Sequence, residues 1–217
     1  MFAYPKQAEF NRVVPKTKIY AHARVSKRIK ELFAKQVGEI LWKYKLSPET
    51  INLPTRNGIN EIQVFDVMLK TPELDPEVLQ AIDKAIPFAL IFQLTYDGQV
   101  SFAASYKRPN EADASKWVIG ATFQTAPRPV GDERSPLPIA LDLAGLYEHI
   151  VRRHIPLPQR PGEGLAEQVA RYNELEAKRK VQQQLKARIA QEKQFNRKVE
   201  LNAALRTLSQ EIETLSH

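Results

Sequence analysis

Hydrophobic residues three or four positions apart define the first regular element of the chain. In residues 26–45 they form a single stripe, which predicts an amphipathic helix with Ser26 as its N-cap. The helix must end near Leu46, because a proline at position 48 disfavours helical backbone in the residue before it. Ser47 and Pro48 then suit the cap and first position of a short turn, SPET, that joins this helix to a sheet.

Three segments rich in β-forming residues predict four strands. Residues 59–70, INEIQVFDVMLK, place hydrophobic side chains on both alternating faces, which is typical of a strand covered on two sides. Residues 88–107 contain two strand-like runs on either side of Asp97-Gly98, the pair favoured in a type I′ hairpin turn. Residues 116–124, KWVIGATFQ, predict the fourth strand.

Two more amphipathic helices accompany these strands. Asp75 as N-cap and Pro76 at the first helical position start one helix, which ends before Pro87. Residues 139–153 predict the other. Together the elements predict an α+β domain in residues 1–157, with a mainly antiparallel sheet of about four strands covered by amphipathic helices.

The C-terminal part of the chain has a different pattern. A linker rich in Pro and Gly at residues 158–164 precedes residues 165–217, which contain neither. A continuous helix over the latter range would be about 80 Å long, and one small core cannot stabilise it. We therefore predict a helical or coiled-coil arm that pairs with a second copy, folds back as a hairpin or lies on a partner. Its last hydrophobic residues keep the 4-3-4-3 spacing of a coiled-coil seam: Leu201, Leu205, Leu208, Ile212 and Leu215.

Composition and charge narrow the class of protein. The 217 residues include no cysteine, which removes disulfides and thiolate chemistry. No run reaches the roughly 18 apolar residues of a membrane span, and residues 1–16 lack the apolar core of a secretory signal, so we expect a cytoplasmic protein without membrane contact. The net charge of +7 is concentrated at the two ends of the chain. Such ends could bind phosphate, form solvated helical faces or meet the mildly acidic middle of another subunit.

Residues with catalytic chemistry are sparse. The chain has no phosphate-binding glycine loop, no nucleophile elbow and no metal-binding His pair, so the residues predict no catalytic site, no cofactor and no metal. One alternative is a magnesium-dependent nuclease, in which Glu61 and Asp66 on the first strand hold the metal beside Lys70 or Lys107. Solvation at strand ends explains the same residues, because no acid precedes either lysine by two positions.

Basic and aromatic residues are the candidate contacts for nucleic acid or a partner protein. Tyr106, Lys107 and Arg108 form a cluster that could clamp nucleic acid, although a sheet edge packed on a helix uses the same residues. Glu49 and Thr50 are not required by a purely structural turn, which makes them candidate partner contacts. The other candidates are the basic residues of the first helix and of the arm: Lys27, Arg28, Lys30, Lys35, Lys178, Arg179, Lys180, Arg188, Arg197 and Lys198.

Several sequence segments of the chain resemble those of a known bacterial family. WKYKLSPETINLP, EIQVFDVMLK, AIPFALIFQLTYDG and AASYKR are similar to segments of the family called domain of unknown function 4391. The resemblance covers about residues 10–155, and Ala89 stands where the family pattern has a second proline. It implies an accessory role, because genes of this family lie beside helicases and DNA methyltransferases of restriction-like and antiviral defence clusters. No catalytic residue is carried over from it.

The leading hypothesis is therefore a non-catalytic accessory subunit of a DNA-acting complex. Its basic helical surfaces would contact a helicase or methyltransferase partner, or DNA. Two alternatives stay open: the magnesium-dependent nuclease, and a structural homodimer joined through the C-terminal helix without contact to nucleic acid.

Overall fold

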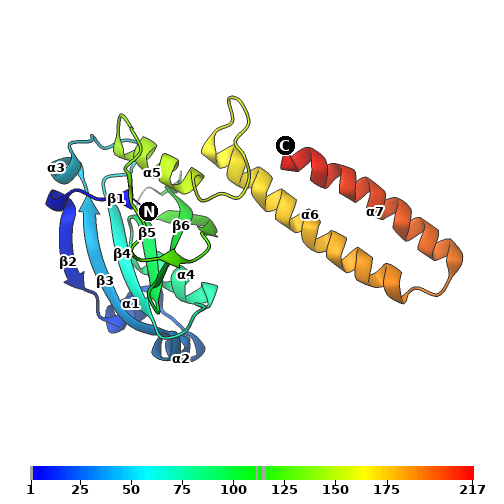
Figure 1. Cartoon of the computed structure of the whole chain (residues 1–217), viewed down its shortest axis with the longest axis horizontal. Helices are drawn as coiled ribbons and strands as arrows, with labels where there is room; N and C mark the ends of the chain where they lie inside the picture. Colours follow the sequence, from blue (N-terminus) through cyan, green and yellow to red (C-terminus); the bar gives the residue numbers. More distant parts are fainter. Residues whose placement is uncertain (1, 111, 114–115) are drawn as a thin grey trace. The chain divides into compact units, whose positions relative to one another are not determined.

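The computed structural model describes residues 2–110, 112–113 and 116–217. The chain divides into two compact units, residues 1–154 and residues 155–217. The first combines helices with a mostly antiparallel sheet, so the predicted α+β class is confirmed (Figure 1). The second contains two long helices. The segment 158–164, expected to be a linker, lies within the second unit and is hydrogen-bonded to it through Arg171.

One sheet of seven strands forms the centre of the first unit, which is more than the four strands expected. The order of its six main strands is β2-β3-β4-β5-β6-β7, and a short strand, β8, pairs with β6. All neighbours are antiparallel except β4 and β5, which are parallel and connected through a helix. The strands are β2 (Glu9–Val13), β3 (Val37–Leu46), β4 (Ile62–Leu69), β5 (Ala89–Tyr96), β6 (Gln99–Pro109), β7 (Trp117–Gln124) and β8 (Arg128–Pro129).

The helix predicted over residues 26–45 is wrong in its second half. Helix α2 (Lys27–Gln36) begins as expected, with the Ser26 side chain accepting a hydrogen bond from the backbone of Ile29. It then passes directly into β3. The pairing of β3 with β4 shifts register twice, and the buried residues of β3 are consequently spaced three, four and two apart instead of alternating. These irregularities give a strand the spacing of a helix.

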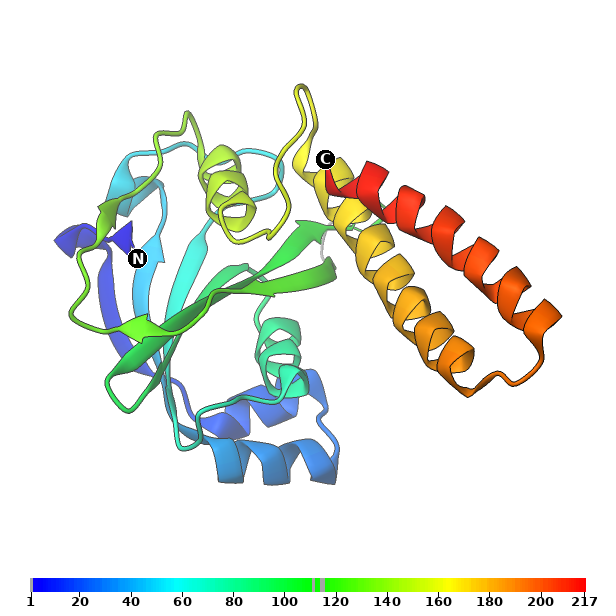
Figure 2. The same ribbon diagram turned by 45° about the vertical axis from the view of Figure 1, so that its right-hand side comes forward.

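Three helices cover one face of the sheet. Helices α1 (Lys16–Ala23), α2 and α4 (Pro76–Ala85) lie together in Figures 1 and 2, and α4 starts at the predicted N-cap, Asp75. They bury a hydrophobic core with alternate residues of β4 and β5. The largest side chains of this core are Phe33, Phe65, Phe92, Ile19, Ile40 and Ile82.

The other face of the sheet is covered by smaller elements. Helix α5 (Leu143–Arg152) buries Tyr147, whose hydroxyl donates a hydrogen bond to the backbone carbonyl of Ser105 on β6. A separate two-stranded parallel sheet joins β1 (Phe2–Ala3) to β9 (Ser135–Pro136). Two short helices complete the unit, η1 (Lys6–Ala8) and α3 (Pro48–Ile51). The predicted Asp97-Gly98 turn between β5 and β6 is confirmed, since both residues have positive φ as a type I′ turn requires.

The second unit is a helical hairpin, so the arm folds back on itself. Helix α6 (Leu165–Gln191) and helix α7 (Phe195–Ser216) lie side by side with opposite directions (Figures 1 and 2). Lys178 forms an ion pair with Glu211 at 2.8 Å, and Gln182 donates a hydrogen bond to Ser209. Of the three arrangements the sequence left open for the arm, the structure shows the hairpin.

Candidate functional site

The SPET turn has an internal structural role. The backbone of Ser47 donates to the Thr50 hydroxyl, and the Thr50 hydroxyl donates to the carbonyl of Lys45, so that Thr50 is held within its own turn. The first of these contacts is part of a capping box for α3. Glu49 is exposed and accepts a hydrogen bond from the Ser47 hydroxyl, which lowers its pKa. Of the two candidate contacts here, Glu49 is the one whose side chain is exposed.

The basic residues of α2 are exposed, but part of their charge is neutralised. Arg28 forms ion pairs with Glu77 at 2.6 Å and with Asp75 at 3.7 Å, which connect α2 to the start of α4. Lys30 lies over the ring of Tyr20. Lys27 and Lys35 are exposed on the same helix.

The prediction that Lys107 belongs to an exposed cluster is wrong. Its side chain is 1% exposed and forms an ion pair with Asp83 of α4 at 3.0 Å. Its ammonium group also donates to the backbone carbonyls of Asp83 and Ile86, and it lies over the ring of Trp117. Lys107 therefore holds α4 against the sheet and cannot contact nucleic acid. Tyr106 and Arg108, its neighbours on β6, are partly buried.

The two candidate nuclease carboxylates do not converge. Glu61 directly precedes β4 and Asp66 lies on it, five positions away, so their side chains leave the strand on opposite faces. Each has its own lysine partner: Lys45 lies 3.2 Å from Glu61, and Lys43 lies 2.5 Å from Asp66. A shared magnesium site at these two residues is therefore wrong.

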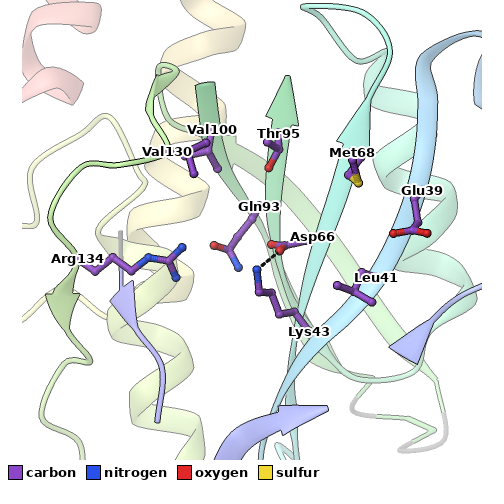
Figure 3. Close-up of a pocket in the computed structure, with 10 residues that line it drawn as sticks. All are labelled: Glu39, Leu41, Lys43, Asp66, Met68, Gln93, Thr95, Val100, Val130 and Arg134. Atoms are coloured by element: carbon purple, nitrogen blue, oxygen red, sulfur yellow. Dashed lines mark hydrogen bonds and ion pairs between the residues drawn. The ribbon is translucent and has the colours of Figure 1, made fainter. Parts of the chain in front are cut away.

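A cavity of about 250 Å³ lies on the sheet face opposite the helical layer, and we call it the sheet cavity. Figure 3 shows its lining residues, with Lys43 reaching Asp66 and with Gln93 and Arg134 directed toward one another. Gln93 is only 2% exposed, yet its side-chain nitrogen has no hydrogen-bond partner in the described part of the chain. This combination of a cavity and a buried unpaired donor is typical of a binding site.

The far end of the helical hairpin, residues 178–206, forms a second distinctive feature, which we call the basic tip. It contains nine Lys and Arg residues and two acidic residues, a net charge of +7 that equals the net charge of the whole chain. Residues 1–45 are also basic, with 11 Lys and Arg residues against three acidic ones, and acidic residues elsewhere offset their charge. All six candidate contact residues of the arm lie in this segment.

The basic tip and the sheet cavity differ in how far the sequence alone predicts them. Lysine and arginine in a Pro-free polar helix indicated the basic tip, but only the fold-back brings α6 and α7 together. Sequence reasoning missed the sheet cavity. In the sequence, Gln93 is a single polar residue in an apolar strand, and no local pattern connects it to Arg134, which lies in a loop 41 residues later.

Among the described residues, no cluster of three His, Asp or Glu side chains is arranged to hold a metal ion. The helices in this part of the chain are also all too short or too polar to cross a membrane. The fold and its sites thus define an α+β protein with a helical hairpin that is strongly basic around the turn between its two helices.

This chain belongs to the family described as Domain of unknown function (DUF4391), whose model matches residues 2–212. The match includes the hairpin as well as the sheet, so both units are part of the family's domain. No curated protein matches the chain. No solved structure matches it either.

Proposed function

We propose that the protein is a non-catalytic accessory subunit of a cytoplasmic DNA-acting complex, and that the basic tip binds the phosphate backbone of nucleic acid. The observation that carries this proposal is the dense and exposed positive charge of residues 178–206, which hold nine Lys and Arg residues against two acidic ones. Clustered Lys and Arg supply most of the affinity of a protein for nucleic acid, because each phosphate contact releases condensed counterions.

The charge of the basic tip is available to a ligand. Lys178, Arg179 and Arg197 have acidic partners nearby. The other six cations form no ion pair with any described residue, and all six are exposed: Lys180, Lys186, Arg188, Lys193, Lys198 and Arg206. Because these charges stay in water, they attract polyanions without a large desolvation cost.

An exposed aromatic residue lies among these charges. Phe195, at the start of α7, is 78% exposed, and Arg197 and Lys198 follow it closely in the chain. An aromatic ring beside basic side chains can stack on an unpaired base while the cations hold the backbone. The family resemblance supports a helicase or DNA methyltransferase as the protein partner of the complex.

Matched charge reversals on two helical surfaces test the proposal. The tip variant carries Lys180→Glu, Arg188→Glu and Lys198→Glu, and the control carries Lys27→Glu, Lys30→Glu and Lys35→Glu on α2. All six residues are exposed, so both proteins should fold, and both change the net charge equally. Binding of the full chain to labelled duplex and single-stranded DNA would be measured by fluorescence anisotropy at several salt concentrations.

We expect the tip variant to bind at least about tenfold more weakly, with a salt dependence lowered by about three phosphate contacts, and the control to bind nearly as the parent does. Equal losses in both variants would show that net charge alone attracts DNA and would overturn the assignment to the tip. A parent protein that does not bind DNA even at low salt, and sediments as a dimer, would instead support the structural homodimer.

A further inference from the structure

The sheet cavity contains two polar groups without partners. Gln93 on β5 points its carboxamide into the cavity, and its nitrogen has no hydrogen-bond partner among the described residues. Arg134, on the opposite wall, forms no ion pair with a described residue.

The β1–β9 pair positions Arg134. Arg134 directly precedes β9, and β9 pairs in parallel with β1, so the N-terminal strand supports the backbone on the Arg134 side of the cavity.

The local charge favours a monoanion. Lys43 and Asp66 neutralise each other at 2.5 Å, which leaves the guanidinium of Arg134 as the uncompensated charge beside Gln93. Glu39 lies on the far side of the cavity, where it is exposed to solvent. Leu41, Met68 and Val100 supply apolar lining.

We propose that the sheet cavity binds a small organic molecule with one carboxylate group and an apolar body. The carboxylate would accept hydrogen bonds from Gln93 and Arg134, and the apolar body would lie on Leu41, Met68 and Val100. Arginine and carboxylate form strong, directional hydrogen bonds, and a buried amide donor is costly for a fold unless a ligand satisfies it.

Two buried glutamines on neighbouring strands are expected to respond differently to substitution if the proposal is correct. Gln63 is equally buried, on the other face of the sheet, but its nitrogen donates to Glu61 at 2.6 Å. Replacing Gln63 by Leu removes a satisfied hydrogen bond and should lower the unfolding midpoint. Replacing Gln93 by Leu removes an unpaired donor, so the midpoint should stay the same or rise while ligand binding is lost.

The test is a binding measurement on the full chain with defined probes. Acetate, isovalerate and benzoate would be titrated by calorimetry and by ligand-observed NMR, with isovaleramide as the neutral analogue and inorganic phosphate as the competing anion. The variants are Gln93→Leu and Arg134→Gln, and the controls are Gln63→Leu and Arg128→Gln, a substitution of an exposed arginine outside this cavity.

We expect at least one carboxylate to bind saturably, with a dissociation constant of about 1 mM or lower for a molecule of this size, and isovaleramide not to bind. Gln93→Leu and Arg134→Gln should each weaken binding about tenfold or more, whereas the two controls should not. The assignment is overturned if none of the carboxylates binds, if phosphate binds in their place, or if Gln93→Leu lowers the unfolding midpoint as much as Gln63→Leu does.

Discussion

Lys107 in the sheet and Lys180 in the hairpin are both lysines of short basic runs, Tyr-Lys-Arg and Lys-Arg-Lys, but their surroundings are opposite. Lys107 is buried and held by a carboxylate and two backbone carbonyls. Lys180 is exposed and has no ion-pair partner in the described structure. The first stabilises the fold, and the second is free to meet a ligand. A basic run in the sequence therefore does not show whether its lysines stabilise the fold or bind a ligand until the position of its backbone is known.

The difference arises from distant parts of the chain. Asp83, the partner of Lys107, lies on α4, and the sheet brings the two together only when α4 packs on it. Burial lowers the pKa of Lys107, while Asp83 acts in the opposite direction. One carboxylate oxygen of Asp83 has no partner among the described residues, so this carboxylate depends strongly on Lys107.

The largest effect is expected for Lys107→Met. It leaves the Asp83 carboxylate buried without its cation, which should cost about 3–5 kcal/mol in the free energy of unfolding. Urea denaturation would measure this loss, with Lys180→Met as the exposed control that should leave stability unchanged. The double variant Lys107→Met/Asp83→Leu should recover much of the loss. A Lys107→Met protein of full stability would contradict the structural role of the pair.

A smaller effect is expected from acid at the base of the hairpin. Hydrogen bonds from Arg171 hold the pKa of Glu163 at about 2. Because the folded state prefers the charged carboxylate, the stabilisation is complete above about pH 4.5 and is lost as the pH falls toward 2. The second unit should lose about 1–3 kcal/mol over this range. Urea denaturation followed by helical circular dichroism at about pH 5 and pH 3 would measure it.

Glu163→Gln is the control for this pH dependence. The variant should already be less stable near neutral pH, and its hairpin should lose less stability than the parent on acidification. An equal loss in both proteins would assign the acid sensitivity to other carboxylates.

The smallest effect is expected for Lys178→Met. Lys178 pairs with Glu211 across the two helices of the hairpin, but both side chains remain in contact with water. Exposed ion pairs contribute little, because solvent and salt screen the attraction. The urea midpoint should stay within the reproducibility of the measurement. A clear loss would mean that the hairpin relies on its surface charges, and the contrast with Lys107 would then be weaker.

Much of the fold could be predicted from local signals. The Asp75-Pro76 helix start, the Asp97-Gly98 turn and the Ser26 cap depend on chemistry within a few residues, and all three are confirmed. The strand β3 could not be predicted in the same way. Its two register shifts are set by pairing with β4, which lies later in the chain, and they remove the alternation by which strands are recognised.

The two candidate sites also differ in whether local sequence could predict them. The basic tip consists of exposed lysines and arginines of polar helices, and such residues can be recognised directly in the sequence. The sheet cavity instead combines Gln93 of one strand with Arg134 of a distant loop. Nothing in the spacing of these residues connects them, because only the folded sheet makes them neighbours.

The pairing of β1 with β9 also sets an order of events during synthesis. Phe2 is synthesised before all six main strands of the sheet, and its partner Ser135 is synthesised only after them. Closing so long a loop is slow compared with forming the β5–β6 hairpin. The wall of the sheet cavity is thus expected to be the last part of the first unit to assemble. A substitution that weakens the β1–β9 pairing would consequently disturb the cavity and leave the hydrophobic core intact.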